Sequence, residues 1–277
     1  MSESSGGDDA EAAGGTDSPS TTDAADTSDT PDSAPGTEQA EASDGSAPVV
    51  VCFDMDGVLV DSEDYWHAAE REEILPRVLD GDHPDLDEVT GMYYGEIYDY
   101  LDAEYETTVS KSEFMNLYDE TAETIYGEQV DLLNGARAFV EELRREGVPV
   151  ALVSSSPRDW IDVVLDRFDL SFDLIAPAEE FDGAGKPEPG LFEAAIADLG
   201  GVPARAVVIE DSANGVLGAA RSGAYTIAVR DAHNAETDLS AADEVVDRTD
   251  PEVLYDAVRQ STRTMRESVS GSNGSSG

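Results

Sequence analysis

The stretch that decides the fold reads Val49-Val50-Val51-Cys52-Phe53-Asp54-Met55-Asp56-Gly57-Val58-Leu59-Val60-Asp61-Ser62-Glu63. Its apolar start ends in two carboxylates, Asp54 and Asp56, one residue apart. A short β-branched run of this kind is typical of a strand buried on both faces, as in a parallel sheet covered by helices. Doubly wound sheets bind ligands where their strands end. We therefore take the run as the first strand and the two aspartates as candidate site residues.

Further apolar runs follow along the chain, at residues 148–154, 206–209, 225–229 and 244–246. Helical patterns lie between them: the apolar spacing at 135–146 stops before Gly147, and a similar stretch at 191–199 stops before Gly200. Glycine commonly follows the end of a helix. Alternating strands and helices predict an α/β fold, a doubly wound, Rossmann-like parallel sheet.

One segment breaks this alternation. Residues 65–130 carry helical patterns without a convincing buried strand, and Ser110 and Glu113 have the spacing of a capping box. We predict a small all-helical cap inserted after the first strand, on a core made of residues 48–64 and 131–260.

The two ends of the chain differ from the rest in composition. Residues 1–47 and 261–277 are dominated by small and polar side chains, whose burial could not offset the entropy lost on ordering. We expect a disordered acidic tail over residues 1–47 and a flexible tail over residues 261–277.

The charge balance is strongly acidic, with 62 Asp and Glu against 16 Lys and Arg and a formal net charge of -46. Repulsion disfavours binding to nucleic acid or to an anionic membrane. The acidity extends beyond the first 48 residues, which predicts an acidic folded surface of the halophilic kind, whose self-repulsion salt would screen. We see neither a signal peptide nor a run of roughly 18 apolar residues, so we expect a cytoplasmic protein. The oligomeric state is left open.

Polar residues also follow the later strands. A serine run, 154–156, ends the second run, the pair Glu210-Asp211 ends the third, and Lys186 lies in a loop rich in glycine and proline. Clustered carboxylates repel one another unless a hard divalent cation is bound, and Mg²⁺ is the natural choice. A carboxylate beside such a cation can attack phosphorus while hydroxyls and an ammonium hold the phosphoryl oxygens.

Each feature also has an ordinary explanation. An Asp-x-Asp pattern arises by chance in so acidic a chain, and the serine run or Glu210-Asp211 could merely cap a helix. Lys186 is stronger evidence for a functional site than the acidic and serine residues are, because only two of the 16 basic residues are lysines. Arg158 would face either phosphate or solvent. We assign no metal to the three histidines and expect Cys52, Trp66, Trp160 and most tyrosines of residues 93–105 to serve packing.

Four segments, taken together, resemble a known family. Residues 54–63 (DMDGVLVDSE), 153–156 (VSSS), 185–189 (GKPEP) and 209–215 (IEDSANG) are similar to the four motifs of the haloacid dehalogenase superfamily of phosphohydrolases and phosphomutases. The resemblance extends over about residues 49–246. It is greatest to the subgroup of β-phosphoglucomutase and phosphoglycolate phosphatase, which has a small helical cap.

The resemblance implies catalytic roles for three residues. Asp54 would be the nucleophile that forms an aspartyl-phosphate, and Asp56 would protonate the leaving group and then activate water. Lys186 would neutralise charge on Asp54 and on the phosphoryl oxygens. The implied activity is that of a Mg²⁺-dependent phosphatase acting on a small phosphorylated metabolite, such as phosphoglycolate or a sugar phosphate.

The resemblance also implies binding roles. Ser154 and the backbone amide of Ser155 would hold the phosphoryl group together with Lys186. Asp211 would bind Mg²⁺ directly, and Glu210 would support the metal site. The implied metal set is completed by the carboxylate of Asp54 and the backbone carbonyl of Asp56.

A phosphomutase is the nearest alternative function. It must hold a second phosphate through basic cap residues, but where the mutase pattern has lysine, glycine and arginine this chain has Thr-Gly-Met-Tyr-Tyr at residues 90–94. Trp66 stands where the mutase has a cap histidine, with His67 one position away. These departures favour hydrolysis. A dehalogenase would lack the second aspartate, Asp56.

A non-enzymatic phospho-receiver combines similar residues on a similar sheet. Its phosphoaccepting aspartate ends a later strand, however, and it has no helical insertion. The position of Asp54 after the first strand therefore favours the enzyme.

Overall fold

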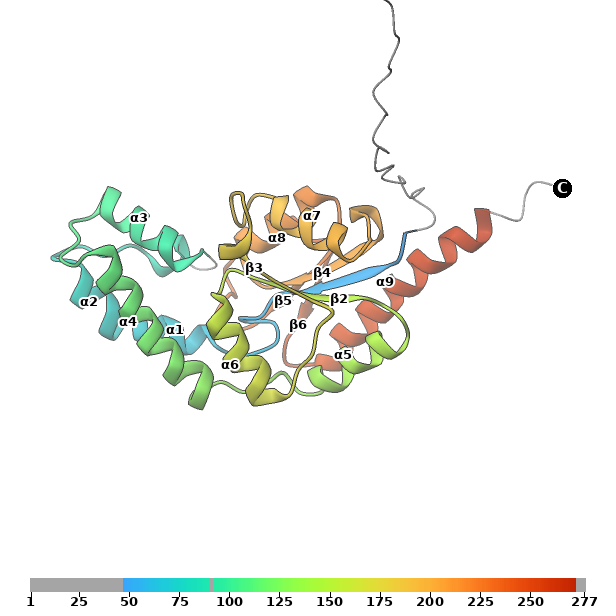
Figure 1. Cartoon of the computed structure of the whole chain (residues 1–277), viewed down its shortest axis with the longest axis horizontal. Coiled ribbons are helices and arrows are strands. Elements are labelled where there is room, and N and C mark those ends of the chain that lie inside the picture. Colours follow the sequence, from blue (N-terminus) through green and yellow to red (C-terminus); the bar gives the residue numbers. More distant parts are fainter. Residues whose placement is uncertain (1–46, 90–91, 273–277) are drawn as a thin grey trace, which may run out of the picture. The chain divides into compact units, whose positions relative to one another are not determined.

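The computed structural model describes residues 47–89 and 92–272 (Figure 1). The predicted disordered tail lies outside these ranges apart from Ala47. Positions 90 and 91 of the cap lie outside them as well.

The described part contains a six-stranded, all-parallel sheet in the order β3-β2-β1-β4-β5-β6. The central strand β1 pairs with β2 on one side and β4 on the other, so that Cys52 lies opposite both Ala151 and Val208. This arrangement confirms the predicted doubly wound α/β fold. The strands are β1 Val50–Phe53, β2 Val150–Ser154, β3 Leu174–Pro177, β4 Ala206–Glu210, β5 Tyr225–Arg230 and β6 Glu244–Asp247.

Alternate residues of β1 face opposite layers of helices. Val51 and Phe53 pack with the helices α5, α6 and α9, whereas Val50 and Cys52 pack with α7 and α8, on the other side of the sheet in Figure 1. Cys52 is fully buried, as expected. The core helices are α5 Ala136–Arg145, α6 Arg158–Phe168, α7 Gly190–Asp198, α8 Ala213–Ser222 and α9 Pro251–Ser272, with short turns η4 Ala178–Glu180 and η5 Pro203–Arg205.

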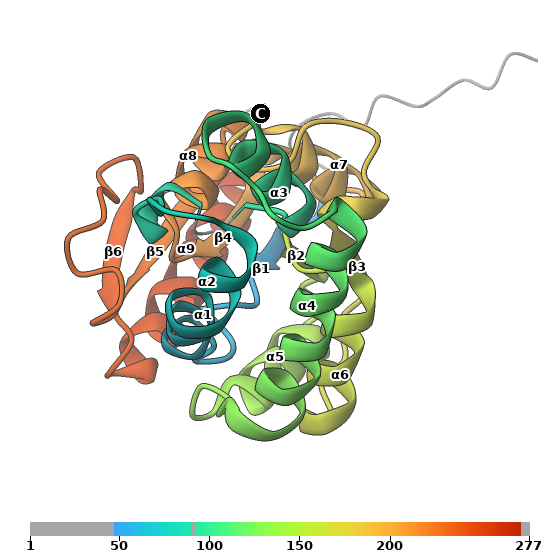
Figure 2. The same cartoon turned by 90° about the vertical axis from the view of Figure 1, so that its left-hand side faces the viewer.

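The described chain between β1 and β2 forms helices joined by loops and turns, with isolated β-bridges but no strand. We call residues 63–129 the cap; Figure 2 shows its helices in front of the sheet. The predicted capping box is present, since the Ser110 side chain accepts a hydrogen bond from the Glu113 amide and the Glu113 carboxylate accepts one from the Ser110 amide. The cap elements are α1 Glu63–Ala69, η1 Glu70–Ile74, α2 Leu75–Val78, η2 Leu86–Glu88, α3 Tyr94–Glu104, α4 Lys111–Thr124 and η3 Ile125–Gln129.

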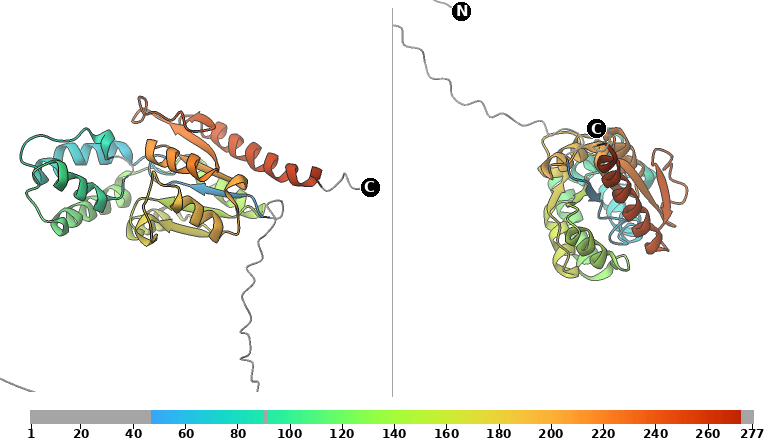
Figure 3. Two further views of the ribbon diagram at one scale, coloured as in Figure 1. Left: turned by 90° about the horizontal axis from the view of Figure 1, so that it is seen from above. Right: turned by 90° about the vertical axis from the view of Figure 1, so that its right-hand side faces the viewer.

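Two expectations need correction. Strand β3 was not predicted, because it is a short edge strand whose first three residues are only half-buried and whose last is a proline. The flexible tail predicted from residue 261 is wrong as far as residue 272, since α9 continues to that point, with its last turns extending past the sheet (Figure 3). Thr262 is buried and the Met265 carbonyl accepts a hydrogen bond from Arg205, so packing extends a helix that composition alone did not reveal.

No helix within residues 47–89 and 92–272 is long and apolar enough to span a membrane.

Candidate active site

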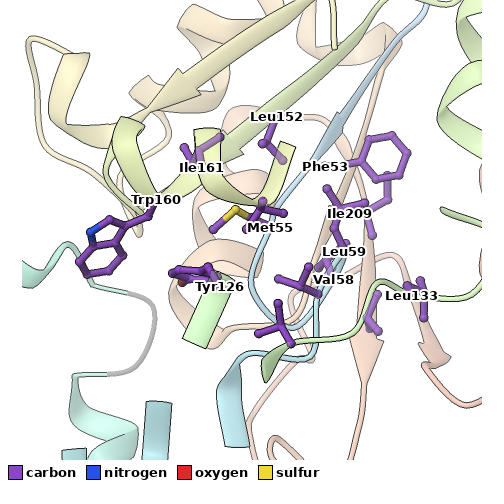
Figure 4. Packing of buried hydrophobic residues seen from close by; sticks show 14 of the residues in the cluster. Phe53, Met55, Val58, Leu59, Tyr126, Leu133, Leu152, Trp160, Ile161 and Ile209 are labelled. Carbon is purple, nitrogen blue, oxygen red and sulfur yellow. The ribbon is translucent and has the colours of Figure 1, made fainter. Parts of the chain in front are cut away.

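The two aspartates leave β1 on the same side because the residue between them is anchored. Met55 is fully buried and points into the core beside Ile161 (Figure 4). The amide of Asp54 donates to the Ile209 carbonyl at 3.0 Å, which continues the sheet pairing by one residue. Asp54 and Asp56 therefore emerge at the carboxyl edge of the sheet, as the strand pattern predicts.

The turn after Asp56 requires a glycine. Gly57 has a φ of 69°, a conformation that costs other residues energy. A Cβ at this position would also overlap the carboxylate of Asp211. Gly57 thus lets the first motif approach the last one closely.

Lys186 is buried between two carboxylates. Its Nζ lies 2.7 Å from Asp54 Oδ1 and 2.6 Å from Glu210 Oε1, and donates to the Val153 carbonyl at 3.2 Å. Burial by itself would lower the pKa of Lys186, but the two carboxylates outweigh it and hold that pKa above its usual value. The ammonium therefore remains charged beside Asp54.

Three buried carboxylates gather around that ammonium. Oxygens of Asp54, Glu210 and Asp211 lie within 4.8 Å of one another. Burial raises the pKa of Asp54 and of Asp211 well above the usual range, and neighbouring carboxylates add to both shifts. One ammonium does not offset three carboxylates, so this oxygen-only donor set fits a hard divalent cation.

Glu210 is fixed by the start of α8. Its Oε2 accepts hydrogen bonds from the Asp211 amide at 3.1 Å and from the Ser212 amide and hydroxyl at 3.3 and 3.1 Å. A Cβ at Gly215 would overlap this carboxylate. The helix cap is Ser212, which accepts from the Gly215 amide at 3.0 Å, so capping is not the function of Glu210-Asp211.

The carboxylate of Asp56 lies apart from this cluster and accepts hydrogen bonds from hydroxyl groups. Tyr126 donates to Oδ1 at 2.6 Å, Ser156 donates to Oδ2 at 2.7 Å, and Ser62 also donates to Oδ1. The indole of Trp66 donates in turn to the Tyr126 hydroxyl at 2.9 Å. A cap residue therefore holds the candidate acid and base in position.

The serine run lies at the end of β2. Ser154 is 1% exposed and its hydroxyl accepts from the Ser156 amide at 3.0 Å. Ser154 and Ser155 line the same cavity as Asp54 and Lys186, which suits them to hold an anion beside the ammonium.

This cavity has a volume of about 80 Å³ and is lined by both core and cap. It is far smaller than the 300–1,000 Å³ usual for drug-sized ligands. Of the sequence-predicted site residues, Glu210 alone does not line it and lies behind Lys186. The six that line it are Asp54, Asp56, Ser154, Ser155, Lys186 and Asp211.

Several residues at the site were not predicted. His233 Nε2 lies 2.8 Å from Asp211 Oδ2, and the Asn234 side chain donates to the Asp211 carbonyl at 2.8 Å. Both follow β5. Polar residues after the apolar run at 225–229 could have been proposed as site residues, as they were after the earlier runs. Ser62 and Glu63 lie in the first motif and Ser156 in the second, but no role was assigned to them, whereas Tyr126 and Glu70 belong to no motif.

Some alternatives left open by the sequence can now be decided. Arg158 is half-buried and pairs with Asp162 and Glu180, and it does not line the cavity. Trp66 and Trp160 do pack, stacking with ring centroids 5.1 Å apart, but both also line the cavity, as does Tyr94.

Comparison with known proteins identifies relatives of this chain. The sequence model of the haloacid dehalogenase-like hydrolases matches residues 49–223. Hexitol phosphatase B of Escherichia coli (strain K12) is 32% identical over 188 residues, which cover 66% of this chain and 84% of the relative.

Solved structures share the fold. The structure of CbbY from Rhodobacter sphaeroides with xylulose bisphosphate superposes with a TM-score of 0.63 at 21% identity, covering 72% of this chain and 93% of the other. β-Phosphoglucomutase from Clostridium difficile gives a TM-score of 0.62 at 22% identity, covering 78% and 98%.

Proposed function

The chain belongs to the haloacid dehalogenase-like hydrolase family and is a phosphoric monoester hydrolase; from this premise we propose a Mg²⁺-dependent phosphatase that works through an aspartyl-phosphate on Asp54. One observation carries the proposal above all. The Asp54 carboxylate lies in a small cavity, 2.7 Å from a buried ammonium and within 4.8 Å of two further carboxylates.

In the first half of the proposed reaction, Asp54 displaces the leaving group. A carboxylate oxygen attacks phosphorus, the bond from phosphorus to the ester oxygen breaks, and Asp56 gives a proton to that oxygen. Lys186 and the Ser154 and Ser155 groups hold the phosphoryl oxygens, where negative charge accumulates. The product is an alcohol and a phosphorylated Asp54.

In the second half, water releases the phosphate. Asp56, now a carboxylate, takes a proton from a water molecule, whose oxygen attacks phosphorus and breaks the bond to Asp54. Inorganic phosphate leaves and both aspartates regain their starting states. The hydroxyls of Tyr126, Ser62 and Ser156 orient Asp56 for both transfers.

Mg²⁺ would be held by the carboxylates of Asp54 and Asp211, with Glu210 holding the Asp211 backbone amide and Lys186. The ion would supply positive charge that offsets the clustered carboxylates and the phosphoryl group. Mg²⁺ suits this set of oxygen donors better than a metal that prefers nitrogen or sulfur.

The cavity favours hydrolysis over a mutase reaction. Among the described residues that line it, Lys186 is the only lysine or arginine, and residues 90 and 91 are threonine and glycine. A second phosphate would thus find no lysine or arginine on the part of the cavity wall that the described cap residues form. The relative named hexitol phosphatase B is consistent with a phosphorylated carbohydrate or similar metabolite as substrate.

We further propose that the enzyme acts on this soluble metabolite in the cytoplasm, without a nucleic-acid or membrane partner. The net charge of -46 supports this, because it repels other polyanions.

Phosphate release from p-nitrophenyl phosphate tests the proposal. We expect turnover with Mg²⁺, loss of turnover on chelation and recovery when Mg²⁺ is restored. Asp54→Asn should reduce kcat by at least about 1,000-fold, because it removes the nucleophile. Equal rates for wild type and Asp54→Asn, or a rate indifferent to chelation, would contradict the proposal.

A further inference from the structure

Asp211, the proposed metal ligand that follows β4, is held at three of its polar groups. Its amide donates to Glu210 Oε2 at 3.1 Å, its carbonyl accepts from the Asn234 side chain at 2.8 Å, and its carboxylate oxygen Oδ2 lies 2.8 Å from His233 Nε2. Glu210 belongs to the same motif as Asp211, but His233 and Asn234 belong to none of the four motifs. A segment outside the motifs therefore fixes a residue of the proposed metal site.

The loop after β5, which carries His233, is itself held by hydrogen bonds. The Arg230 side chain donates to the backbone carbonyls of three of its residues, Asn234, Ala235 and Thr237. Asn234 is buried; its Nδ2 also donates to the Val229 carbonyl at 2.9 Å, and its Oδ1 accepts from the Asp231 amide at 2.8 Å. His233 therefore extends from a fixed backbone and can in turn fix its partner.

His233 reaches Asp211 from outside the active-site cavity. Asp211 lines that cavity and also a neighbouring one of about 340 Å³, whereas His233 lines only the neighbouring cavity. The side chains of His233 and Asp211 are 7% and 4% exposed. Among the described acidic, histidine and cysteine side chains, the group close enough to hold a metal ion is Asp54, Glu210 and Asp211. His233 is thus placed to support a ligand of the ion, not to bind the ion.

The chemistry of the pair determines which atom donates. An Asp211 carboxylate that binds a divalent cation is ionised and has no proton to give. The imidazole of His233 must therefore carry a hydrogen on Nε2 and donate it to Oδ2. Such a donor fixes the orientation of a ligating carboxylate, and loss of a partner of this kind typically weakens metal binding about 10- to 100-fold.

A donor on Oδ2 also discriminates between cations. Ca²⁺ is large and often takes both oxygens of a carboxylate, whereas Mg²⁺ is smaller and requires near-octahedral geometry. The hydrogen bond from His233 competes with a cation for Oδ2, and so it disfavours binding through both oxygens of Asp211. The pair should therefore favour Mg²⁺ over Ca²⁺.

We propose that His233 is a positioning residue, which holds the Asp211 carboxylate in the orientation that binds Mg²⁺ and raises the preference of the site for Mg²⁺ over Ca²⁺. The inference rests on the proposed Mg²⁺-dependent phosphatase and extends its metal site to the loop after β5. His233 acts through Asp211 and does not contact the substrate.

Two amide variants of the full chain test this role. His233→Gln and His233→Asn both replace the imidazole by a carboxamide and differ by one methylene. The glutamine Nε2 can reach the point that the imidazole Nε2 occupies, whereas asparagine is too short. In isothermal titration calorimetry, Mg²⁺ should bind His233→Asn about tenfold more weakly than wild type and His233→Gln within about threefold of wild type. In matching titrations with Ca²⁺, His233→Asn should lose less affinity than it loses for Mg²⁺.

His83→Asn is the matched control, since His83 is exposed and lines neither cavity; it should bind Mg²⁺ as wild type does. A merely structural role would lower the melting temperature of the His233 variants and leave Mg²⁺ affinity unchanged, which would overturn the inference. Equal losses of Mg²⁺ affinity in His233→Gln and His233→Asn would overturn it as well, and so would equal losses for Mg²⁺ and Ca²⁺ in His233→Asn. A wild type that binds no Mg²⁺ contradicts the proposed metal site itself, whereas Mg²⁺ binding that His233→Asn does not weaken contradicts only the role of His233.

Discussion

At the scale of single residues, the position of Asp56 depends on a cap hydroxyl. Tyr126 is 1% exposed and donates to Asp56 at 2.6 Å. Hydrogen bonds to charged groups contribute about 1.5–3 kcal/mol. The orientation of Asp56, the proposed acid and base, is therefore coupled to the placement of the cap segment η3.

Replacing Tyr126 by phenylalanine should uncouple the orientation of Asp56 from the cap segment η3 while preserving the aromatic ring. We expect Tyr126→Phe to lower kcat about tenfold or more, with a smaller change in KM, because Asp56 loses one of the groups that orient it for proton transfer. Tyr98→Phe is the control, since it also removes a tyrosine hydroxyl hydrogen bond, to the Val109 carbonyl, but away from the cavity. Steady-state kinetics with unchanged kcat for Tyr126→Phe would contradict this role.

The buried Glu70 should make stability depend on pH. Its pKa rises from 4.5 to about 7 on folding. Between these values the unfolded chain loses the proton while the folded one keeps it, so the free energy of unfolding falls as pH rises through this range. The loss should approach about 3 kcal/mol above pH 7.

Urea unfolding of wild type and Glu70→Gln at pH 5 and pH 8 measures this effect. We expect the variant to gain stability relative to wild type on going from pH 5 to pH 8, because glutamine has no proton to lose. Glu72→Gln, at an exposed position, should show no such gain. A stability difference between Glu70→Gln and wild type that is the same at both pH values would be evidence against a raised pKa.

The clustering of Asp54, Lys186 and Asp211 could be predicted from sequence, whereas the cap residues that line the same cavity could not. Asp54, Lys186 and Asp211 follow apolar strands or lie in a loop with unusual composition, and parallel strands bring such positions to one edge. Glu70 and Tyr126 acquire their roles from tertiary packing, such as the stacking of Trp66 on Trp160. No local pattern encodes a contact between residues so distant in sequence.

At the scale of elements, regular helices and buried strands were predicted better than edges. The central strands are wholly buried and gave clear apolar runs. Strand β3 is half-exposed, and the end of α9 is polar enough to read as a tail. In both cases the neighbouring elements stabilise a segment whose own composition is ambiguous.

The capping box of α4 provides a test of local stability in the cap. Ser110 accepts from the Glu113 amide at 3.3 Å, and losing such a cap typically costs about 1 kcal/mol. Ser110→Ala should therefore lower the free energy of unfolding by about 1 kcal/mol in urea titrations, without changing kcat, since Ser110 does not line the cavity. Ser112→Ala, within the same helix, should be neutral or slightly stabilising; an equal loss in both variants would count against the cap.

At the scale of the whole molecule, charge is the dominant feature. With 62 acidic and 16 basic residues, most carboxylates have no basic partner, and their mutual repulsion opposes folding. Salt shortens the range of this repulsion to about 3 Å at 1 M. An acidic surface of this kind should therefore work best in concentrated salt.

The transition temperature should rise by several degrees from dilute buffer to molar KCl, because screening weakens repulsion among the carboxylates. Thermal unfolding followed by circular dichroism measures the change. A nonionic osmolyte at matched osmolality serves as control for effects other than screening. A transition temperature indifferent to KCl, or equally raised by the osmolyte, would argue against adaptation to salt.

The central claim concerns one bond, between phosphorus and Asp54. Wild-type enzyme turning over p-nitrophenyl phosphate with Mg²⁺ can be treated with borohydride, which reduces an aspartyl-phosphate to homoserine, and then digested for peptide mass spectrometry. The account predicts homoserine at Asp54 in the peptide that contains both aspartates, and none when substrate is omitted. Homoserine at Asp56 instead, or at neither position while phosphate is still released, would contradict it.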